Sequence, residues 1–499
     1  MYRQLHRRLA ALQKADLSDV RLEVVMTRSL LLAFAVTMLN TIGSSAEPDA
    51  FFRKDGGLES SLGQKLPSNL APKDAVVWEQ PLLPGNSTPC IHGDAIYVTT
   101  WDAEKKQLAI VSLDKNSGRR LWTRVLPPTP IERVHPVGSP ASASPACDGE
   151  RVYAFFGSYG LVCCDLKGNL LWSKALGPFQ DEFGAASSPI LLDDLVILNE
   201  DHDVDSFVIA INKLTGETVW RQPRGEFTRS YSTPVVWEHG GQKLVVIAGS
   251  LKLVAYDPRD GKPVWWVRGL SRIVDTTPVI FGDRLYLATW TPGGDQAERI
   301  AMPEFAEGLK LHDKNGDGAI GRDELPKDSP VTPRFFRMDT NLDQQLSKPE
   351  WDRHRQVFAL AQNAAIAVRP GGRGDVTDTH VDWVYRRGLP TVPSPLVYQG
   401  VMYMVKDSGV ITALDAQTGR LIKQLRARGR GNYYASPVAG DGKVYFLSER
   451  GVLTVLRSGQ DPALLSSHDF TERIMATPVV HQGRFYVRTD QFMRCFSGP

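Results

Sequence analysis

The sequence has few cysteines, almost no net charge and no apolar run long enough to cross a membrane. Five cysteines among 499 residues cannot all pair, and the Cys and His spacings of zinc sites do not occur, so we expect the cysteines to be small apolar strand residues. The 58 basic and 56 acidic residues leave a formal net charge of +2, which does not predict a nucleic-acid partner. A serine nucleophile elbow, a zinc-protease motif and a P-loop are also missing.

The longest apolar run lies near the N-terminus and is organised like an export signal. Residues 30–39 are predominantly apolar, Arg28 precedes them and the small residues 44–46 follow, an order typical of a cleaved signal peptide. This run is too short to span a bilayer; a buried helix or a short anchor is the alternative. We interpret residues 1–46 as a signal peptide, with Met26 as a second candidate for the translation start, and residues 47–73 as a linker. The mature chain is then periplasmic or extracellular, with no transmembrane segment.

A repeat dominates the rest of the chain. A Ser/Thr-Pro pair followed by an apolar stretch recurs with spacings of 56, 44, 45, 44, 117, 42 and 41 residues. A period in the low forties, with short strands between Gly, Asp and Pro turns, is typical of propeller blades. The sequence therefore predicts an all-β fold, an eight-bladed β-propeller. The pairs begin at Thr88, Ser144, Ser188, Thr233, Thr277, Ser394, Ser436 and Thr477.

Most copies end in the pattern Asp-x-x-x-Gly-x-x-x-Trp. In the first copy these residues are Asp114, Gly118 and Trp122. Glycine suits the positive φ of a tight hairpin, and the Asp can accept hydrogen bonds from N–H groups of the same turn. The Trp offers a large flat face that can pack between neighbouring blades. The sixth copy has Ile422 near the position of the Trp, and the seventh copy is degenerate.

The last copy is one strand short. After Thr477 the chain supplies three strand patterns and ends, whereas residues 74–82 resemble a closing strand that has no blade of its own. Pairing these two segments would close the ring and remove both open sheet edges. We therefore assign residues 74–290 to blades one to four and the first part of blade five. Residues 365–499 form the remainder of the propeller, which the strand at 74–82 closes.

The long gap holds a small α-helical insertion in blade five, residues 291–364, with two acidic loops. Residues 313–324 match the EF-hand calcium loop at every defined position, and in residues 339–350 Gln344 replaces the expected Gly. We predict one or two Ca²⁺ ions, the second bound more weakly, and a short β-bridge between Ile320 and Leu346. Calcium either holds the insertion folded, which we favour, or regulates it. The predicted ligands are Asp313, Asn315, Asp317, Ala319 and Glu324 in the first loop and Asp339, Asn341, Asp343, Gln345 and Glu350 in the second.

Polar residues in loops between strands are the remaining candidates for a site. Glu132, His135 and His202 could be catalytic, but lone loop histidines are more often solvated. Residues 200–203 could bind a cation, although a polar turn explains them equally well. A basic cluster, which could bind an anionic group but which we expect to be an exposed loop, contains Arg426, Arg428 and Arg430 beside Tyr433 and Tyr434.

The Asp-x-x-x-Gly-x-x-x-Trp repeat resembles that of pyrroloquinoline-quinone (PQQ) dehydrogenases and their non-enzymatic relatives. These relatives include the propeller lipoprotein of the outer-membrane barrel assembly machine. Residues 183–189, 371–377 and 433–437 are similar to an exported PQQ-like repeat family of planctomycete-type bacteria. The resemblance covers about residues 50–499 and implies the fold rather than an activity. A PQQ enzyme would need the quinone and a calcium ion at the ring centre, a catalytic Asp and a stacking Trp, and neither that Asp nor that Trp maps onto this chain by motif.

We expect an exported, monomeric, calcium-binding propeller that acts as a non-catalytic binding or scaffold protein for a protein or glycan partner. One alternative is a PQQ-dependent alcohol or sugar dehydrogenase. The other is a scaffold that assists outer-membrane assembly.

Overall fold

The computed structural model describes residues 57–58, 63–71, 73–132, 134–299 and 301–498. The predicted signal peptide and the first part of the predicted linker lie outside the described residues. The described residues belong to one unit, Pro48–Pro499. None of the helices within them is both long enough and apolar enough to cross a membrane.

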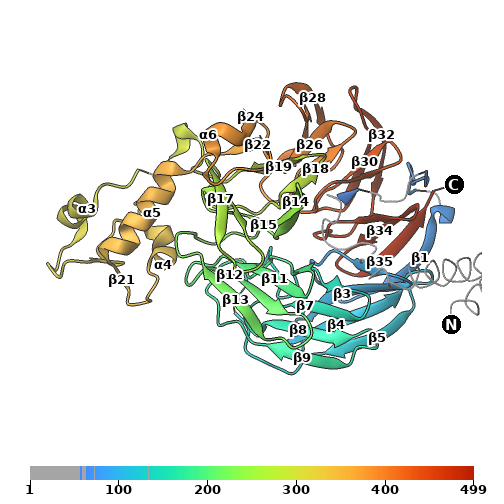
Figure 1. The fold of residues 1–499 in the computed structure, drawn as a ribbon, viewed down its shortest axis with the longest axis horizontal. Coiled ribbons are helices and arrows are strands. Elements are labelled where there is room, and N and C mark those ends of the chain that lie inside the picture. Colours follow the sequence, from blue (N-terminus) through green and yellow to red (C-terminus); the bar gives the residue numbers. More distant parts are fainter. Residues whose placement is uncertain (1–56, 59–62, 72, 133, 300, 499) are drawn as a thin grey trace, which may run out of the picture. The chain divides into compact units, whose positions relative to one another are not determined.

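Eight four-stranded antiparallel sheets follow one another along the chain, which confirms the predicted number of blades (Figure 1). Short strands rich in Val, Ile and aromatic residues build them, and Gly, Asp and Asn form the turns. The first four blades contain β2 (Cys90–His92), β3 (Ala95–Asp102), β4 (Gln107–Asp114) and β5 (Arg120–Val125); β6 (Ala146–Cys147), β7 (Arg151–Phe155), β8 (Leu161–Asp165) and β9 (Leu170–Lys174); β10 (Ile190–Leu192), β11 (Leu195–Glu200), β12 (Phe207–Asn212) and β13 (Thr218–Pro223); β14 (Val235–His239), β15 (Gln242–Gly249), β16 (Lys252–Tyr256) and β17 (Pro263–Arg268).

The next three blades follow the same order, except that the insertion separates the second and third strands of blade five. They contain β18 (Val279–Phe281), β19 (Arg284–Thr289), β22 (Ala364–Val368) and β24 (Val381–Tyr385); β25 (Leu396–Tyr398), β26 (Val401–Lys406), β27 (Val410–Asp415) and β28 (Leu421–Arg426); β29 (Val438–Gly440), β30 (Lys443–Leu447), β31 (Val452–Arg457) and β32 (Ala463–Asp469). Between β22 and β24, β23 (Gly374–Asp375) adds a parallel strand to the outer edge of β17, and α6 (Thr377–His380) follows it.

Both ends of the described chain build blade eight. β1 (Val76–Pro81) pairs antiparallel with β35 (Phe492–Ser497), beside β34 (Arg484–Arg488) and β33 (Val479–His481), and Trp78 lies opposite Cys495. This pairing is the closure predicted from the short last copy. Arg488, which is buried, donates hydrogen bonds across to blade one, to the carbonyl oxygens of Ser87 (3.2 Å) and Thr99 (2.7 Å).

A tryptophan from the outer strand of one blade lies on the hairpin glycine of the next blade. Trp122 of blade one covers Gly168 of blade two, whose φ is +80°, and its indole N–H donates to the carbonyl oxygen of Leu166 at 2.8 Å. This confirms the predicted packing of Trp between blades. The same contact and the same kind of hydrogen bond occur for Trp78 on Gly118, Trp172 on Gly216, Trp220 on Gly261 and Trp383 on Gly419.

This arrangement explains the two irregular copies. Each Trp packs on the glycine of the following blade. Gly419 of blade six is therefore covered by Trp383 of blade five, although blade six has Ile422 in place of its own Trp. The missing Trp instead affects blade seven, which is the degenerate copy. There the hairpin glycine Gly459 has no Trp against it, and Ile422 packs against a cluster of apolar residues between blades six and seven.

The Ser/Thr-Pro pairs form a hydrogen-bonded ring, which we call the hydroxyl ring. The backbone N–H of Thr88 donates to the hydroxyl of Ser144 at 2.8 Å, and the N–H of Ser144 donates to Ser188 at 3.0 Å. Five further links of the same kind continue the ring to Thr477. All eight side chains are buried. Seven of the eight hydroxyls thus connect neighbouring blades, a role that the sequence analysis did not assign.

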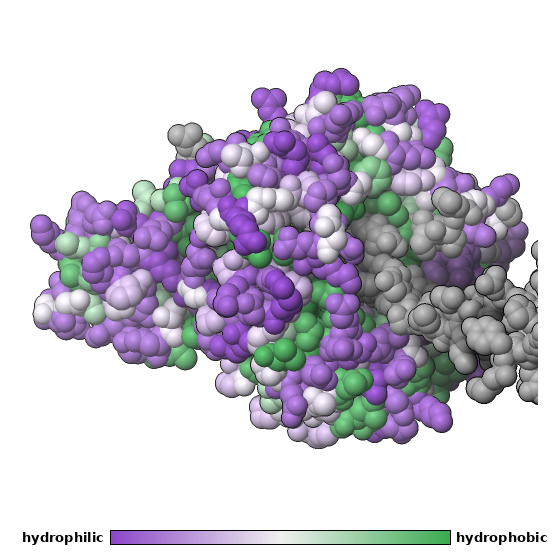
Figure 2. Space-filling model, viewed as in Figure 1, coloured by the Kyte–Doolittle hydropathy of each residue, from purple (hydrophilic) through white to green (hydrophobic). Residues whose placement is uncertain are grey.

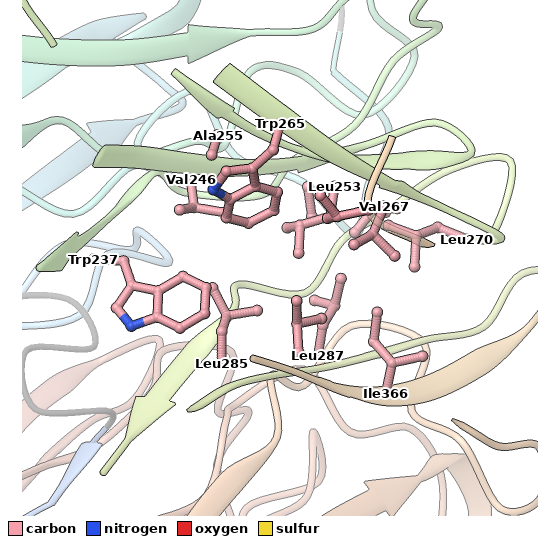
Figure 3. Packing of buried hydrophobic residues seen from close by; sticks show 14 of the residues in the cluster. Trp237, Val246, Leu253, Ala255, Trp265, Val267, Leu270, Leu285, Leu287 and Ile366 are labelled. Carbon is pink, nitrogen blue, oxygen red and sulfur yellow. The ribbon is translucent and has the colours of Figure 1, made fainter. Parts of the chain in front are cut away.

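Apolar side chains fill the spaces between blades. Figure 3 shows the cluster between blades four and five, which includes Leu285, Leu287 and Ile366. Trp237 and Trp265 pack edge to face there, with ring centroids 5.9 Å apart. The five cysteines lie buried in β2, β6, β8 and β35, as expected of small apolar strand residues.

The insertion has its own small core. It contains α3 (Phe305–His312), α4 (Phe335–Met338) and α5 (Lys348–Leu360), the strands β20 (Ile320–Gly321) and β21 (Gln345–Leu346), and the short 3₁₀ turns Gln296–Glu298 and Thr332–Arg334. Ile320 pairs with Leu346, which confirms the predicted bridge between the two acidic loops. Trp351 and Phe358 are buried on one face of α5, and Ser347 and Glu350 cap its N-terminus. Figure 1 shows these helices grouped together, apart from the strands of the blades.

The Trp contact can be tested with a pair of glycines that share the same backbone strain. A Cβ on Gly261 (φ +71°) would lie 2.5 Å from the Trp220 ring, whereas a Cβ on Gly240 (φ +58°) would meet nothing within 4 Å. We expect Gly261→Ala to lower the free energy of unfolding by about 1–3 kcal/mol more than Gly240→Ala does. Denaturant unfolding measures both, and equal losses would contradict the role given to the Trp.

Candidate functional site

A cavity of about 540 Å³ lies at the centre of the ring. All eight side chains of the hydroxyl ring contribute to its wall, so the strands that meet at the propeller axis also enclose this space. Its volume is that of a small-molecule site. The charged residues that line it are Arg229, Arg272, Asp275, Arg337 and Asp407.

The cavity residues obey a simple sequence rule. The residue two positions before each Ser/Thr-Pro hydroxyl residue lines the cavity in every blade, because the chain approaches the ring centre immediately before it enters the inner strand. The Ser/Thr-Pro pairs were therefore the signal that could have located this site from the sequence. These eight residues are Asn86, Ser142, Ala186, Tyr231, Asp275, Val392, Tyr434 and Met475.

His202 is buried in a cluster of charged residues and is not solvated, which corrects the preferred sequence interpretation. Its Nε2 lies 2.9 Å from Glu200 and its Nδ1 lies 3.4 Å from Asp181, while its ring stacks on Phe179 with centroids 3.9 Å apart. Burial lowers the pKa of His202, but the hydrogen bonds and charges of Asp181 and Glu200 outweigh it and raise the pKa to about 10. The His202 ring therefore lies between the carboxyl groups of Asp181 and Glu200.

Residues 200–203 are a buried segment rather than an exposed polar turn. Asp201 pairs with Arg224 through two hydrogen bonds of 2.7 and 2.8 Å, and both side chains are buried. Burial raises the pKa of Glu200 to about 7 and that of Asp203 to about 6. Glu200, Asp201 and Asp203 pair with His202, Arg224 and Arg229 of the same chain. These contacts connect the loops beside the cavity.

Arginine side chains and Asp275 supply the charge at the cavity wall. Burial, with Arg334, Arg337 and Arg229 adding like-charge repulsion, lowers the pKa of Arg272 to about 10. Burial also raises the pKa of Asp275 to about 7. The sequence analysis singled out none of these residues, because each is one isolated charge in its own loop until the ring brings the loops together.

Apart from Tyr434, the other sequence candidates do not line the central cavity. Glu132 and His135 line a second cavity, of about 680 Å³, where Glu132 accepts hydrogen bonds from the backbone N–H of Ser158. Arg428 and Arg430 are exposed in the loop after β28, as expected, and Arg426 is exposed at the end of that strand. Tyr433 is buried, and Tyr434 lines the central cavity.

In the first acidic loop, residues 313–324, the carboxylates at both ends turn inward. The two oxygens of Asp313 accept hydrogen bonds from the N–H groups of Gly316 (2.7 Å) and Gly318 (3.0 Å). Glu324 accepts from Gly321 at 2.7 Å and from Lys314 at 2.7 Å. The first and last predicted ligands therefore face the interior of one loop.

The second loop, residues 339–350, has the same pattern. Asp339 accepts from the N–H of Gln344 at 3.0 Å, and Glu350 accepts from Thr340 at 2.7 Å and from Ser347 at 2.9 Å. Gln344 has a φ of +68°, the backbone conformation expected where Gly was replaced, and Leu342 has a φ of +62°. Side chains are strained at such values, whereas the first loop has Gly at both positions.

Metal binding by these loops stays a prediction. Among the described residues no group of three or more His, Cys, Asp and Glu side chains is arranged as a metal site. In both loops the predicted ligands accept hydrogen bonds from the loop's own N–H groups. The predicted ligands also include side-chain amide and backbone carbonyl oxygens, which bind Ca²⁺ as carboxylates do.

The central cavity does not fit the stacked quinone of a PQQ enzyme. No Trp belongs to the described residues that line it. Five of the tryptophans face the hairpin of the next blade instead, with their indole nitrogens bonded there. The calcium motifs lie in the insertion.

Eight closed blades around a central cavity define a β-propeller of the PQQ-like repeat class. The sequence model of the family described as outer membrane protein assembly factor BamB matches residues 70–196, 178–291, 204–317 and 340–495. The chain belongs to this family, which confirms the resemblance seen in its repeats.

The crystal structure of BamB from Moraxella catarrhalis has the same fold. It is similar over 85% of this chain and 99% of that chain, with a TM-score of 0.53 and 13% sequence identity. The crystal structure of the computationally designed Ika8 protein is similar over 87% of this chain and 100% of that chain, with a TM-score of 0.49 and 10% identity. No curated protein matches the chain.

The buried histidine predicts a pH-dependent stability. Because the pKa of His202 rises from 6.5 to about 10 on folding, its contribution is fully present below pH 6.5 and is lost as the pH rises toward 10. We expect His202→Gln to cost about 1–3 kcal/mol at pH 6, since it removes the charged donor between Asp181 and Glu200, and less at pH 10. Urea unfolding of both proteins at the two pH values measures the difference; a cost independent of pH would contradict the ion pairs.

Proposed function

We propose that this chain is an exported, calcium-binding propeller that acts as a binding scaffold for a protein partner in the cell envelope. The observation that carries the proposal is the match to an assembly-factor family over most of the chain, together with the shared fold. The apolar segment at residues 30–39 supports export. Exported propellers meet their partners outside the cytoplasm, where millimolar calcium would fill weak structural sites.

Apolar residues exposed on outer strands support a protein partner rather than a glycan. Leu121 and Val125 of β5 are 42% and 47% exposed, and Leu170 and Leu171 of β9 are 42% and 47% exposed. Burial of such side chains stabilises protein interfaces. Figure 2 shows apolar residues scattered among the hydrophilic ones on one face of the molecule. The outer edge of blade four already accepts β23 as an additional strand, and extended segments of partner proteins bind in the same manner.

The family description favours an outer-membrane assembly role for this scaffold. Chemical crosslinking in intact cells, followed by identification of the captured proteins, tests that role. We expect barrel proteins or their assembly factors among the products. Capture of none of them, with efficient crosslinking elsewhere in the envelope, would contradict the assembly role.

A PQQ-dependent dehydrogenase is the catalytic alternative. The purified chain, incubated with PQQ and Ca²⁺ and supplied with alcohols or sugars, should not reduce an electron-accepting dye, because its cavity offers no stacking Trp. A PQQ dehydrogenase assayed in parallel is the control. Robust dye reduction would reject the scaffold.

Calcium binding can be tested at the last ligand of the first loop. Glu324 would supply two oxygens to the ion, so Glu324→Gln should abolish the tighter site in calorimetric titrations with Ca²⁺. Glu307→Gln, at an exposed position of α3, is the matched control and should bind as the wild type does. Unchanged binding by Glu324→Gln would reject the proposed ligands.

A further inference from the structure

Three arginines at the wall of the central cavity carry more donors than the chain uses. Arg229 lies in the loop before β14, Arg272 in the loop before β18, and Arg337 in α4 of the insertion. The propeller and the insertion thus contribute to the same space. A guanidinium group has five N–H donors, so the contacts of each one show what remains for a ligand.

Arg229 is buried, yet neither of its terminal nitrogens makes a hydrogen bond. One lies 2.7 Å from Glu182 and the other lies 3.6 Å from Asp203. Both nitrogens therefore have a charged partner nearby, but their N–H groups do not point at it well enough to form a hydrogen bond. A buried charged group with unsatisfied donors is costly. The charge of Arg229 therefore lies next to the cavity wall without being neutralised by ideal hydrogen bonds.

Arg272 and Arg337 are each held in place by one contact with the surrounding chain. The Nε of Arg272 donates to the carbonyl oxygen of Pro292 at 2.9 Å, which fixes the guanidinium plane and is the only hydrogen bond described for that side chain. Arg337 pairs with Glu182 through one terminal nitrogen, and its Nε is buried without a partner. No hydrogen bond is described for the terminal nitrogens of Arg272 or for the second terminal nitrogen of Arg337, so these groups remain to donate to a ligand.

The charges of the lining favour an anion. The charged residues that line the cavity are three arginines and two acidic residues, Asp275 and Asp407. Burial holds the pKa of Asp275 near 7, so this carboxyl is partly neutral at physiological pH. One of its oxygens is buried without a hydrogen-bond partner among the described residues.

We propose that the central cavity binds a small organic anion whose carboxylate or phosphate group is held by Arg272 and Arg337, with Arg229 behind them. Planar guanidinium groups recognise both oxyanions by paired hydrogen bonds. The apolar side chains of Val137, Phe183 and Ile273 line the same cavity and suit a short carbon skeleton. A cavity of about 540 Å³ favours a small molecule over a folded acidic partner.

Isothermal titration of the full chain with succinate, and separately with inorganic phosphate, tests the proposal and distinguishes the two oxyanions. The buffer contains no added calcium, and sodium chloride keeps the ionic strength constant. We expect saturable binding of at least one of the two anions. Arg272→Gln and Arg337→Gln should each weaken it tenfold or more, because each removes a charged donor.

Arg259→Gln is the matched control, since Arg259 is 84% exposed in a hairpin turn and pairs only with Asp257 there. It should bind as the wild type does. Thermal melts of all variants establish folding, and if Arg272→Gln does not fold, Arg337→Gln in the insertion decides. The proposal is wrong if the wild type binds neither anion, if only an acidic peptide binds, or if the folded cavity variants bind as tightly as the wild type.

Discussion

At five junctions of this propeller, a tryptophan of one blade lies on a glycine of the next blade and hydrogen-bonds to the turn beside it. The contact requires a residue without a side chain at positive φ, a flat indole ring and a free carbonyl, which is why Gly and Trp recur at fixed spacing. Trp78 makes this contact from β1 to Gly118 of blade one. The strand that completes blade eight therefore also secures the junction of blades eight and one, and the buried Arg488 adds hydrogen bonds across the same junction.

The hydroxyl ring performs the corresponding task near the axis. Seven of the eight hydroxyls accept a hydrogen bond from a backbone N–H of the neighbouring blade, and these bonds hold the inner strands together around the central cavity. Tryptophans at the periphery and hydroxyls at the centre leave little freedom for one blade to tilt against another. The loops that precede the inner strands consequently present their side chains to the cavity from fixed positions. Preorganised charges such as Arg272 suit recognition, because a ligand does not have to order them.

Much of the fold could be predicted because each blade repeats the same short sequence patterns at a regular spacing. The spacing of Ser/Thr-Pro pairs gives the number of blades, and the short last copy gives the closure by β1. The site was less accessible to sequence reasoning. His202 has the sequence context of a solvated loop residue, and only the folded ring places Asp181 and Glu200 on its two sides. Arg337 lies within the insertion, and no local pattern indicates that α4 reaches the cavity wall.

The account depends most on the closure of the ring by both chain ends, and native-state hydrogen exchange of the intact protein tests it directly. The amides of β1 that pair with β35 should exchange as slowly as those of the inner strands, through the same global opening, because opening β1 also removes Trp78 from blade one. Fast exchange of β1 under conditions in which β33 to β35 remain protected would show that the N-terminal strand is not part of the ring and would contradict the account.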